Sequence, residues 1–311
     1  MSKDGPIVCI GVMVADLIGG PLEHLPGAGG LVLVNEMGLY PGGGAINTAV
    51  ALSELDLEVE IIGKVGNDPL GGFLIDDLDR RTVGTKFVKK DAEVNTSATM
   101  VMVDPDGDRR FVHYIGANAG FTTEDIDFEV VNAASVVHVA GAFVMPGLDG
   151  KPLADLLREA SRSGAITCLD TAWDYSGQWL QLLEPALPYV DYFLPSLVEV
   201  QAMTGCVGPN EAAAELLKYG MRTVVVKLAD EGCMLSTSTG ESFHIPAYEV
   251  DSVDATGAGD CFNAGLIAGI YMGWSLEDSA NLANAMGALC VTEYGAAGGL
   301  RSLSEIKAFM A

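Results

Sequence analysis

Residues 251–265 read DSVDATGAGDCFNAG and join a glycine-rich turn to an apolar helix. Phe262, Leu266 and Ile270 follow at a spacing of four, which predicts a buried stripe along that helix. The first backbone N–H groups of a helix have no partner within the helix and carry partial positive charge, so they suit a phosphate. The stretch therefore predicts an anion site at the start of this helix.

Asp260 falls in the first turn of the same helix, at the mouth of the predicted anion site. Local physics leaves two interpretations open. The carboxylate either stabilises the helix dipole or acts as a general base on an attacking hydroxyl, while the amides of Gly257, Ala258 and Gly259 stabilise the transferring phosphoryl group. The sequence G-x-x-x-x-G-K-[ST] is absent, which excludes a P-loop enzyme, and no third glycine follows at the Rossmann spacing.

The rest of the chain alternates short β-branched runs with helix-compatible segments. The predicted strands are residues 7–12, 59–65, 136–139, 165–169, 189–194 and 223–228. The predicted helices include residues 45–55, 72–81, 152–163 and 210–219. This alternation predicts an α/β fold with a mostly parallel central sheet covered by helices on both faces. No clear linker interrupts the 311 residues, so we expect a single domain over residues 1–311.

Two segments, at about residues 13–40 and 92–118, break this rhythm. In the second, the sequence Asp104-Pro105-Asp106-Gly107 suits a type I turn, and its flanks alternate as in a hairpin. Arg109 and Arg110 are adjacent, so on a strand they point to opposite faces and only one easily reaches a ligand. The segments predict a small β layer that is either a lid over the active site or a structural extension of the sheet edge.

Composition limits the partners and the compartment. The chain has 17 basic and 42 acidic residues, a net charge of −25, which disfavours nucleic acid and anionic membranes. No run reaches the ~20 apolar residues of a membrane span. The six cysteines form no C-x-x-C pair, and most lie in apolar runs, so we expect reduced thiols in a cytoplasmic protein.

A second glycine-rich helix entry, PGGGAINTA, occupies residues 41–49. Gly42 and Gly43 let a ligand approach the backbone closely, and Asn47 offers both a donor and an acceptor to a polyol. Asp16, just after the first strand, could bind hydroxyl groups. Each of these features alone is equally compatible with an ordinary turn or cap.

Taken together, these motifs resemble the ribokinase-like (PfkB) carbohydrate kinase family over nearly the whole chain. One family signature is matched by residues 42–47 (GGGAIN) running on to 63–71 (GKVGNDPLG), and the other by residues 254–260 (DATGAGD). The resemblance implies a ribokinase-like fold with a β-sheet lid, and an ATP-dependent sugar kinase. It also implies Asp260 as the base, the amides of residues 257–259 as the anion hole, and a homodimer formed through the lid.

The resemblance further implies particular binding residues. The acceptor site would be formed by Asp16, Gly42, Gly43, Asn47, Arg109 and Asn118. The ATP site would be formed by Lys227, Ala229, Gly232, Asn284, Gly257 and Gly259. Glu199 would hold Mg²⁺ through water, and Asp254 matches a ligand of the K⁺ site found in some members.

Three positions depart from the family pattern. Ser196 replaces the amide of the usual Asn-x-x-Glu, Ala229 replaces a common glycine, and Gly44 stands where ribokinases proper have lysine. The last difference argues against ribose. Residues 106–111 (DGDRRF) and 116–119 (GANA) resemble fructokinase-like and ketodeoxygluconate kinase-like members, which implies a fructose-like or 2-keto-3-deoxygluconate-like acceptor. A nucleoside kinase of the same family is the alternative. Ser196 and Ala229 also motivate a third hypothesis, an inactive sugar-binding regulator.

Overall fold

A computed structural model describes residues 5–106, 109–296 and 298–311. Its described part contains a nine-stranded sheet in the order β13-β12-β11-β10-β9-β8-β1-β4-β5, parallel except where β12 pairs with β11 and β13. The strands are β1 (Ile7–Gly11), β4 (Val59–Gly66), β5 (Gly84–Asp91), β8 (Val136–Ala142), β9 (Ile166–Thr171), β10 (Tyr192–Phe193), β11 (Thr223–Lys227), β12 (Cys233–Thr237) and β13 (Ser242–Ile245). Apolar side chains fill both faces of this sheet, as the near-continuous β-branched runs require.

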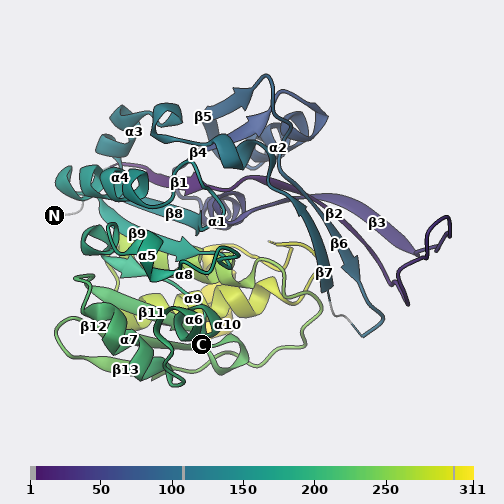
Figure 1. Cartoon of the computed structure of the whole chain (residues 1–311). Coiled ribbons are helices and arrows are strands. Elements are labelled where there is room, and N and C mark those ends of the chain that lie inside the picture. Colours follow the sequence, from purple (N-terminus) through teal and green to yellow (C-terminus); the bar gives the residue numbers. More distant parts are fainter. Residues whose placement is uncertain (1–4, 107–108, 297) are drawn as a thin grey trace.

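Helices cover the two faces (Figure 1). One face packs on α1 (Gly44–Ser53), α2 (Pro69–Arg80), α8 (Ala258–Tyr271), α9 (Leu276–Cys290) and α10 (Leu303–Met310). The other packs on α3 (Phe128–Ala133), α4 (Lys151–Arg162), α5 (Leu180–Leu183), α6 (Leu197–Thr204) and α7 (Pro209–Leu217). The 3₁₀ turns are η1 (Gly116–Gly120), η2 (Thr123–Asp125), η3 (Leu187–Tyr189) and η4 (Ala229–Glu231).

Strand β1 is the point where the strand order reverses. It pairs in parallel with β4 on one side and with β8 on the other. Ligands of open α/β sheets bind beyond the carboxyl ends of strands at such a point. This geometry places the expected site beyond Gly11, at the start of the second sheet.

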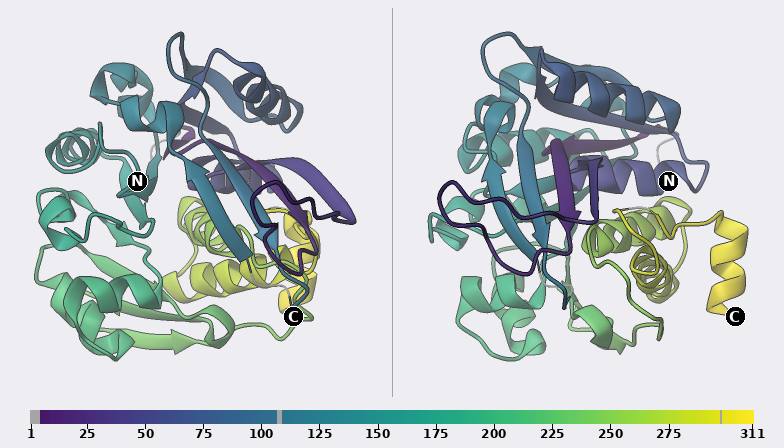
Figure 2. Two further views of the ribbon diagram at one scale, coloured as in Figure 1. Left: turned by 45° about the vertical axis from the view of Figure 1, so that its right-hand side comes forward. Right: turned by 90° about the vertical axis from the view of Figure 1, so that its right-hand side faces the viewer.

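That second sheet has four strands within the described residues, in the order β3-β2-β6-β7. They are β2 (Val14–Gly20), β3 (Glu36–Gly42), β6 (Ala98–Val103) and β7 (Arg109–Tyr114). The strands extend away from the helix-covered body in Figure 1, and Figure 2 shows them as a separate layer. The antiparallel pairing of β6 with β7 confirms the predicted hairpin, although Gly107 of its predicted turn lies outside the described residues.

The predicted α/β architecture is confirmed, with local differences. The predicted strand at residues 189–194 is only Tyr192–Phe193, because η3 includes Tyr189 and residues 190 and 191 connect it to the strand. Strands β5, β12 and β13 were not predicted. The apolar run from Ala264 to Trp274 lies largely within α8, and no described helix is both long and apolar enough to cross a membrane.

Candidate active site

Asp260 lies where α8 meets α1, beyond the end of β1. Its Oδ2 accepts a 2.7 Å hydrogen bond from Nδ2 of Asn47, and its backbone carbonyl accepts one from Thr48. A Cβ atom at Gly44 would stand 3.3 Å from the other carboxylate oxygen, Oδ1. The two glycine-rich helix starts therefore bring Asn47 and Asp260 together across 213 residues of sequence.

The environment of Asp260 makes its carboxylate more basic than usual. Burial raises its pKa to about 6, and the negative charge of Asp170 adds to this rise. The hydrogen bond from Asn47 and the positive charge of Lys227 act in the opposite direction. The group is thus mostly ionised at neutral pH and still able to take a proton.

The start of α8 has the backbone geometry expected of an anion site. Gly257 precedes the helix with a φ of 75°, and a Cβ atom there would approach Ala296 to 2.5 Å, so only glycine fits. The side-chain ammonium of Lys227 lies 3.5 Å from where a Cβ of Gly259 would be. The amide of Ala258 donates to the carbonyl of Ala255 at 3.3 Å, so it is partly engaged. Helix start and lysine together make this corner electropositive.

Several of the predicted acceptor-site residues lie beside Asp260. Asp16 is on β2, and a Cβ atom at Gly42 would lie 2.0 Å from its Oδ2, so glycine is required for the carboxylate to sit there. Gly43 starts α1 with a φ of 91°. Burial raises the pKa of Asp16, while a hydrogen bond from Thr99 and the charge of Arg109 lower it. These groups form a polar wall facing the base.

Two other predicted acceptor residues make contacts that the sequence did not suggest. The amide side chain of Asn118 is buried, accepting from the N–H of Met13 at 3.2 Å and donating to its carbonyl at 3.1 Å. It fixes the backbone between β1 and β2. Arg109 forms an ion pair with Asp254, which lies 145 residues away in sequence.

Five of the six predicted ATP-site residues, all except Gly257, line a cavity of about 580 Å³ on the other side of α8. The lining includes Lys227, Ala229, Gly232, Asn284 and Gly259. Residues 247–250, the first turn of α8 and the C-terminal part of α9 form much of the remaining wall. Asn284 donates to the carbonyls of residues 245 and 246, so its amide fixes the wall rather than pointing freely into the cavity.

The sequence analysis predicted Lys227 and Glu199 but missed Asp170, which joins them in a buried charge cluster behind the anion site. Asp170, at the end of β9, accepts from Nζ of Lys227 at 2.9 Å and from Nδ2 of Asn263 at 2.8 Å. Glu199 lies near enough for the charge of Asp170 to raise its pKa, after burial as the larger cause. The available signal was an aspartate at the carboxyl end of a strand, the edge where ligands of such sheets bind.

This cluster suits Mg²⁺ in the way the resemblance implies. Three carboxylates, of Asp170, Glu199 and Asp260, share the positive charge of Lys227, so negative charge is in excess. No three described acidic, histidine or cysteine side chains converge as direct metal ligands. Ser196 caps α6, and its hydroxyl donates to Oε2 of Glu199 at 2.6 Å.

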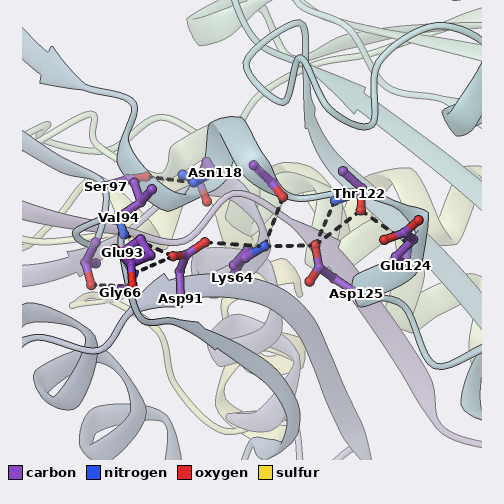
Figure 3. A network of polar contacts seen from close by, with 12 residues as sticks. Lys64, Gly66, Asp91, Glu93, Val94, Ser97, Asn118, Thr122, Glu124 and Asp125 are labelled. Carbon is purple, nitrogen blue, oxygen red and sulfur yellow. Dashed lines mark hydrogen bonds and ion pairs between the residues drawn. The ribbon is translucent and has the colours of Figure 1, made fainter.

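The second part of the first signature fastens the base of the small sheet (Figure 3). Lys64 donates to the carbonyl of Gly120 at 3.0 Å and forms ion pairs with Asp125 at 3.2 Å and Asp91 at 3.5 Å. Asp68 accepts from the backbone N–H of Thr96 at 2.7 Å. These contacts join β4 to the segments that enter and leave the β6–β7 hairpin.

Comparison with solved structures identifies the fold class. An Arabidopsis thaliana ribokinase, solved in complex with ribose and ATP, superposes with a TM-score of 0.87, covering 100% of this chain and 99% of the other at 23% identity. The mostly parallel sheet with its separate four-stranded sheet is therefore the ribokinase fold.

Sequence comparison identifies the family. The model of the pfkB family carbohydrate kinases matches residues 5–303. An uncharacterized sugar kinase of Archaeoglobus fulgidus is 32% identical over 251 residues, covering 81% of this chain and 98% of that relative. A 2-dehydro-3-deoxygluconokinase of Bacillus subtilis is 28% identical, covering 91% and 90%. The chain belongs to the pfkB family of carbohydrate kinases, and it is a phosphotransferase with an alcohol group as acceptor.

Proposed function

We propose that this kinase transfers the γ-phosphoryl group of ATP to a hydroxyl of a fructose-like or 2-keto-3-deoxygluconate-like hexose. The observation that carries the proposal is the position of Asp260. On one side it faces Asn47 and the Asp16 wall, which suit a polyol, and on the other the electropositive start of α8. A hydroxyl bound against that wall would lie between the base and the phosphate.

Asp260 accepts the proton of the attacking hydroxyl. Asn47 engages Oδ2, which leaves Oδ1 to take the proton, and fixes the plane of the carboxylate. A pKa of about 6 keeps the base ionised at neutral pH while preserving its basicity. A positioned base of this kind contributes roughly 10²–10⁴-fold to the rate.

The groups at the start of α8 stabilise the transferring phosphoryl group. The helix-start amides and Nζ of Lys227 lie on one side of the site, and Asp170 holds the lysine in place. Mg²⁺, held through water by Glu199, would neutralise phosphate charge when bound. Asp170 and Glu199 thus hold the lysine and the metal ion, and these two cations stabilise the negative charge that develops on the phosphoryl group.

The four-stranded sheet acts as a lid over the acceptor. Asp16 and Arg109 reach the site from this sheet, so it contributes polar groups as well as cover. Closing the lid would exclude water and favour transfer to the sugar over hydrolysis. The Lys64 contacts lie at the base of this sheet, and we place the hinge of the closure there.

Coupled ADP release with Mg-ATP tests the proposal across ketohexoses, sugar acids, pentoses and nucleosides, with Asp260→Asn beside the wild type. We expect one strong hexose acceptor and loss of transfer in the variant. A nucleoside as the best acceptor would replace the substrate assignment but keep the mechanism. Full activity in Asp260→Asn would refute the mechanism.

We further propose that the outer face of the lid pairs with a second copy of this chain. Cross-strand neighbours Leu17, Met100 and Val112 share this face, and each is at least one-third exposed. With Leu39 and Tyr114 they line an apolar hollow of about 440 Å³. An apolar patch of this kind on a small sheet is typical of a protein interface. Sedimentation should show a dimer, and Met100→Lys a monomer.

A further inference from the structure

Asp254 is almost completely buried, and both of its carboxylate oxygens are engaged. Oδ1 accepts from the backbone N–H of Thr256 at 2.7 Å and from the guanidinium of Arg109. Oδ2 accepts from the backbone N–H of Gly295 at 3.0 Å. The side chain of Asp254 is 1% exposed and that of Arg109 is 15% exposed. The pair is therefore a buried charge pair, which loses much more than a surface pair when one partner is removed.

These contacts do not fit a monovalent cation at Asp254. Three of the roughly four acceptor positions of the carboxylate are occupied. Its single negative charge is balanced by the guanidinium, so a bound K⁺ would be an unbalanced second cation beside Arg109. Asp254, the K⁺ ligand that the family resemblance implies, is thus already paired with Arg109.

Asp254 holds together the two segments that flank the start of α8. Thr256 belongs to the turn that leads into the helix, and Gly295 belongs to the segment after α9. The neighbouring Ala296 packs directly against Gly257. The position of the helix-start amides therefore depends on how Asp254 is held.

The positive charge that balances Asp254 comes from the lid, because Arg109 lies on β7. Arg109 lies opposite Val103 in the hairpin, and the alternation along β7 places Arg109 on the same face as His113. On that face, Thr99 forms a hydrogen bond with His113, and a hydrogen bond from Thr99 also lowers the pKa of Asp16. Arg110 lies on the opposite face, is 56% exposed and pairs with Asp104. Of these two arginines, Arg109 is the one that joins the lid to the segment before α8.

We propose that the guanidinium of Arg109 replaces a monovalent cation at Asp254, so that lid closure itself orders the phosphate-binding turn. The inference rests on the proposed function of that turn as the anion site. It makes the enzyme independent of K⁺ and makes Arg109 a positioning residue for phosphoryl transfer. An open lid would withdraw the guanidinium and leave the turn loosely held, which disfavours hydrolysis of ATP in the absence of acceptor.

The test compares kinase activity and melting temperature in KCl, NaCl and tetramethylammonium chloride at equal ionic strength. For the wild type we expect both values to be the same in the three salts. For Arg109→Ala we expect kcat to fall by roughly a hundredfold, as a buried carboxylate loses its partner. K⁺ or added guanidinium ion should restore part of that activity and raise the melting temperature of this variant. Arg109→Lys should retain more activity than Arg109→Ala, since it keeps the charge.

Arg110→Ala is the matched control, since it removes an adjacent arginine from the outer face, and it should resemble the wild type in every salt. Activation of the wild type by K⁺ would overturn the proposal. So would an Arg109→Ala variant that changes only the acceptor KM, because that result describes a substrate ligand. If no acceptor is phosphorylated at all, the proposed function fails, and the melting temperatures alone decide whether Arg109 replaces the cation.

Discussion

Replacing Asp260 with asparagine should abolish transfer and, at neutral pH, make the protein more stable. The carboxyl pKa rises from 3.8 to about 6 on folding, mainly through burial. Each pKa unit corresponds to 1.36 kcal/mol, so a shift of about two units makes the ionised group destabilising by roughly 3 kcal/mol. Asparagine is neutral and similar in shape, and it can still accept the hydrogen bond from Asn47.

The pH dependence gives this prediction its sign. The folded protein binds the Asp260 proton more tightly than the unfolded chain, so the contribution is favourable below about pH 4 and is lost as pH rises through about 6. The stability advantage of Asp260→Asn should therefore be small near pH 4, grow until about pH 6, and then stay constant at roughly 2–3 kcal/mol. Urea denaturation of both proteins at a series of pH values measures it.

Asp76→Asn is the control, because Asp76 is exposed on α2 and the same substitution there should not reproduce the gain in stability at neutral pH. A variant at Asp260 that is less stable than the wild type at neutral pH would refute the reasoning. So would an advantage that is the same at pH 4 and pH 7, since the effect must follow the titration of the carboxylate.

Three further substitutions test other parts of the site. Asn47→Leu removes the hydrogen bond that favours the ionised form of Asp260, so the acidic limb of the kcat/KM profile should move up by about one pH unit; an unmoved limb would contradict this. Ala229→Gly relieves a left-handed residue with a φ of 55°, so urea unfolding should show about 1 kcal/mol of added stability, and reduced stability would exclude backbone strain there. Gly42→Ala places a Cβ atom 2.0 Å from Oδ2 of Asp16, so steady-state kinetics should show the acceptor KM rising about tenfold with little change for ATP. Equal effects on both substrates would indicate a general folding defect instead.

The start of α8 was predictable because its signals are local. Residues 257–260 (GAGD) are consecutive, and the helix that they begin carries its own apolar spacing. The same holds for Gly43 and Asn47 at the start of α1. Where a few adjacent residues determine the backbone shape, the sequence pattern and the structure agree.

The contacts that the sequence could not predict join distant segments. Asp170 and Lys227 are 57 residues apart and meet only because β9 and β11 lie on either side of β10. Arg109 reaches Asp254 only because the four-stranded sheet lies beside the segment that precedes α8. Asn118 has the amide expected of a sugar ligand, but its burial commits that amide to the backbone of Met13. Short edge strands such as β13 lack enough alternation to be recognised.

The separation of Asn47 from Asp260 by 213 residues also bears on how the protein is made. During synthesis from the N-terminus, all four lid strands and α1 leave the ribosome before any residue of α8. The acceptor half can therefore be assembled while the base, the phosphate-binding turn and the nucleotide cavity do not yet exist. Any nascent chain that ends before α8 lacks both the proposed base and the proposed phosphate-binding turn, so we expect it to consume no ATP.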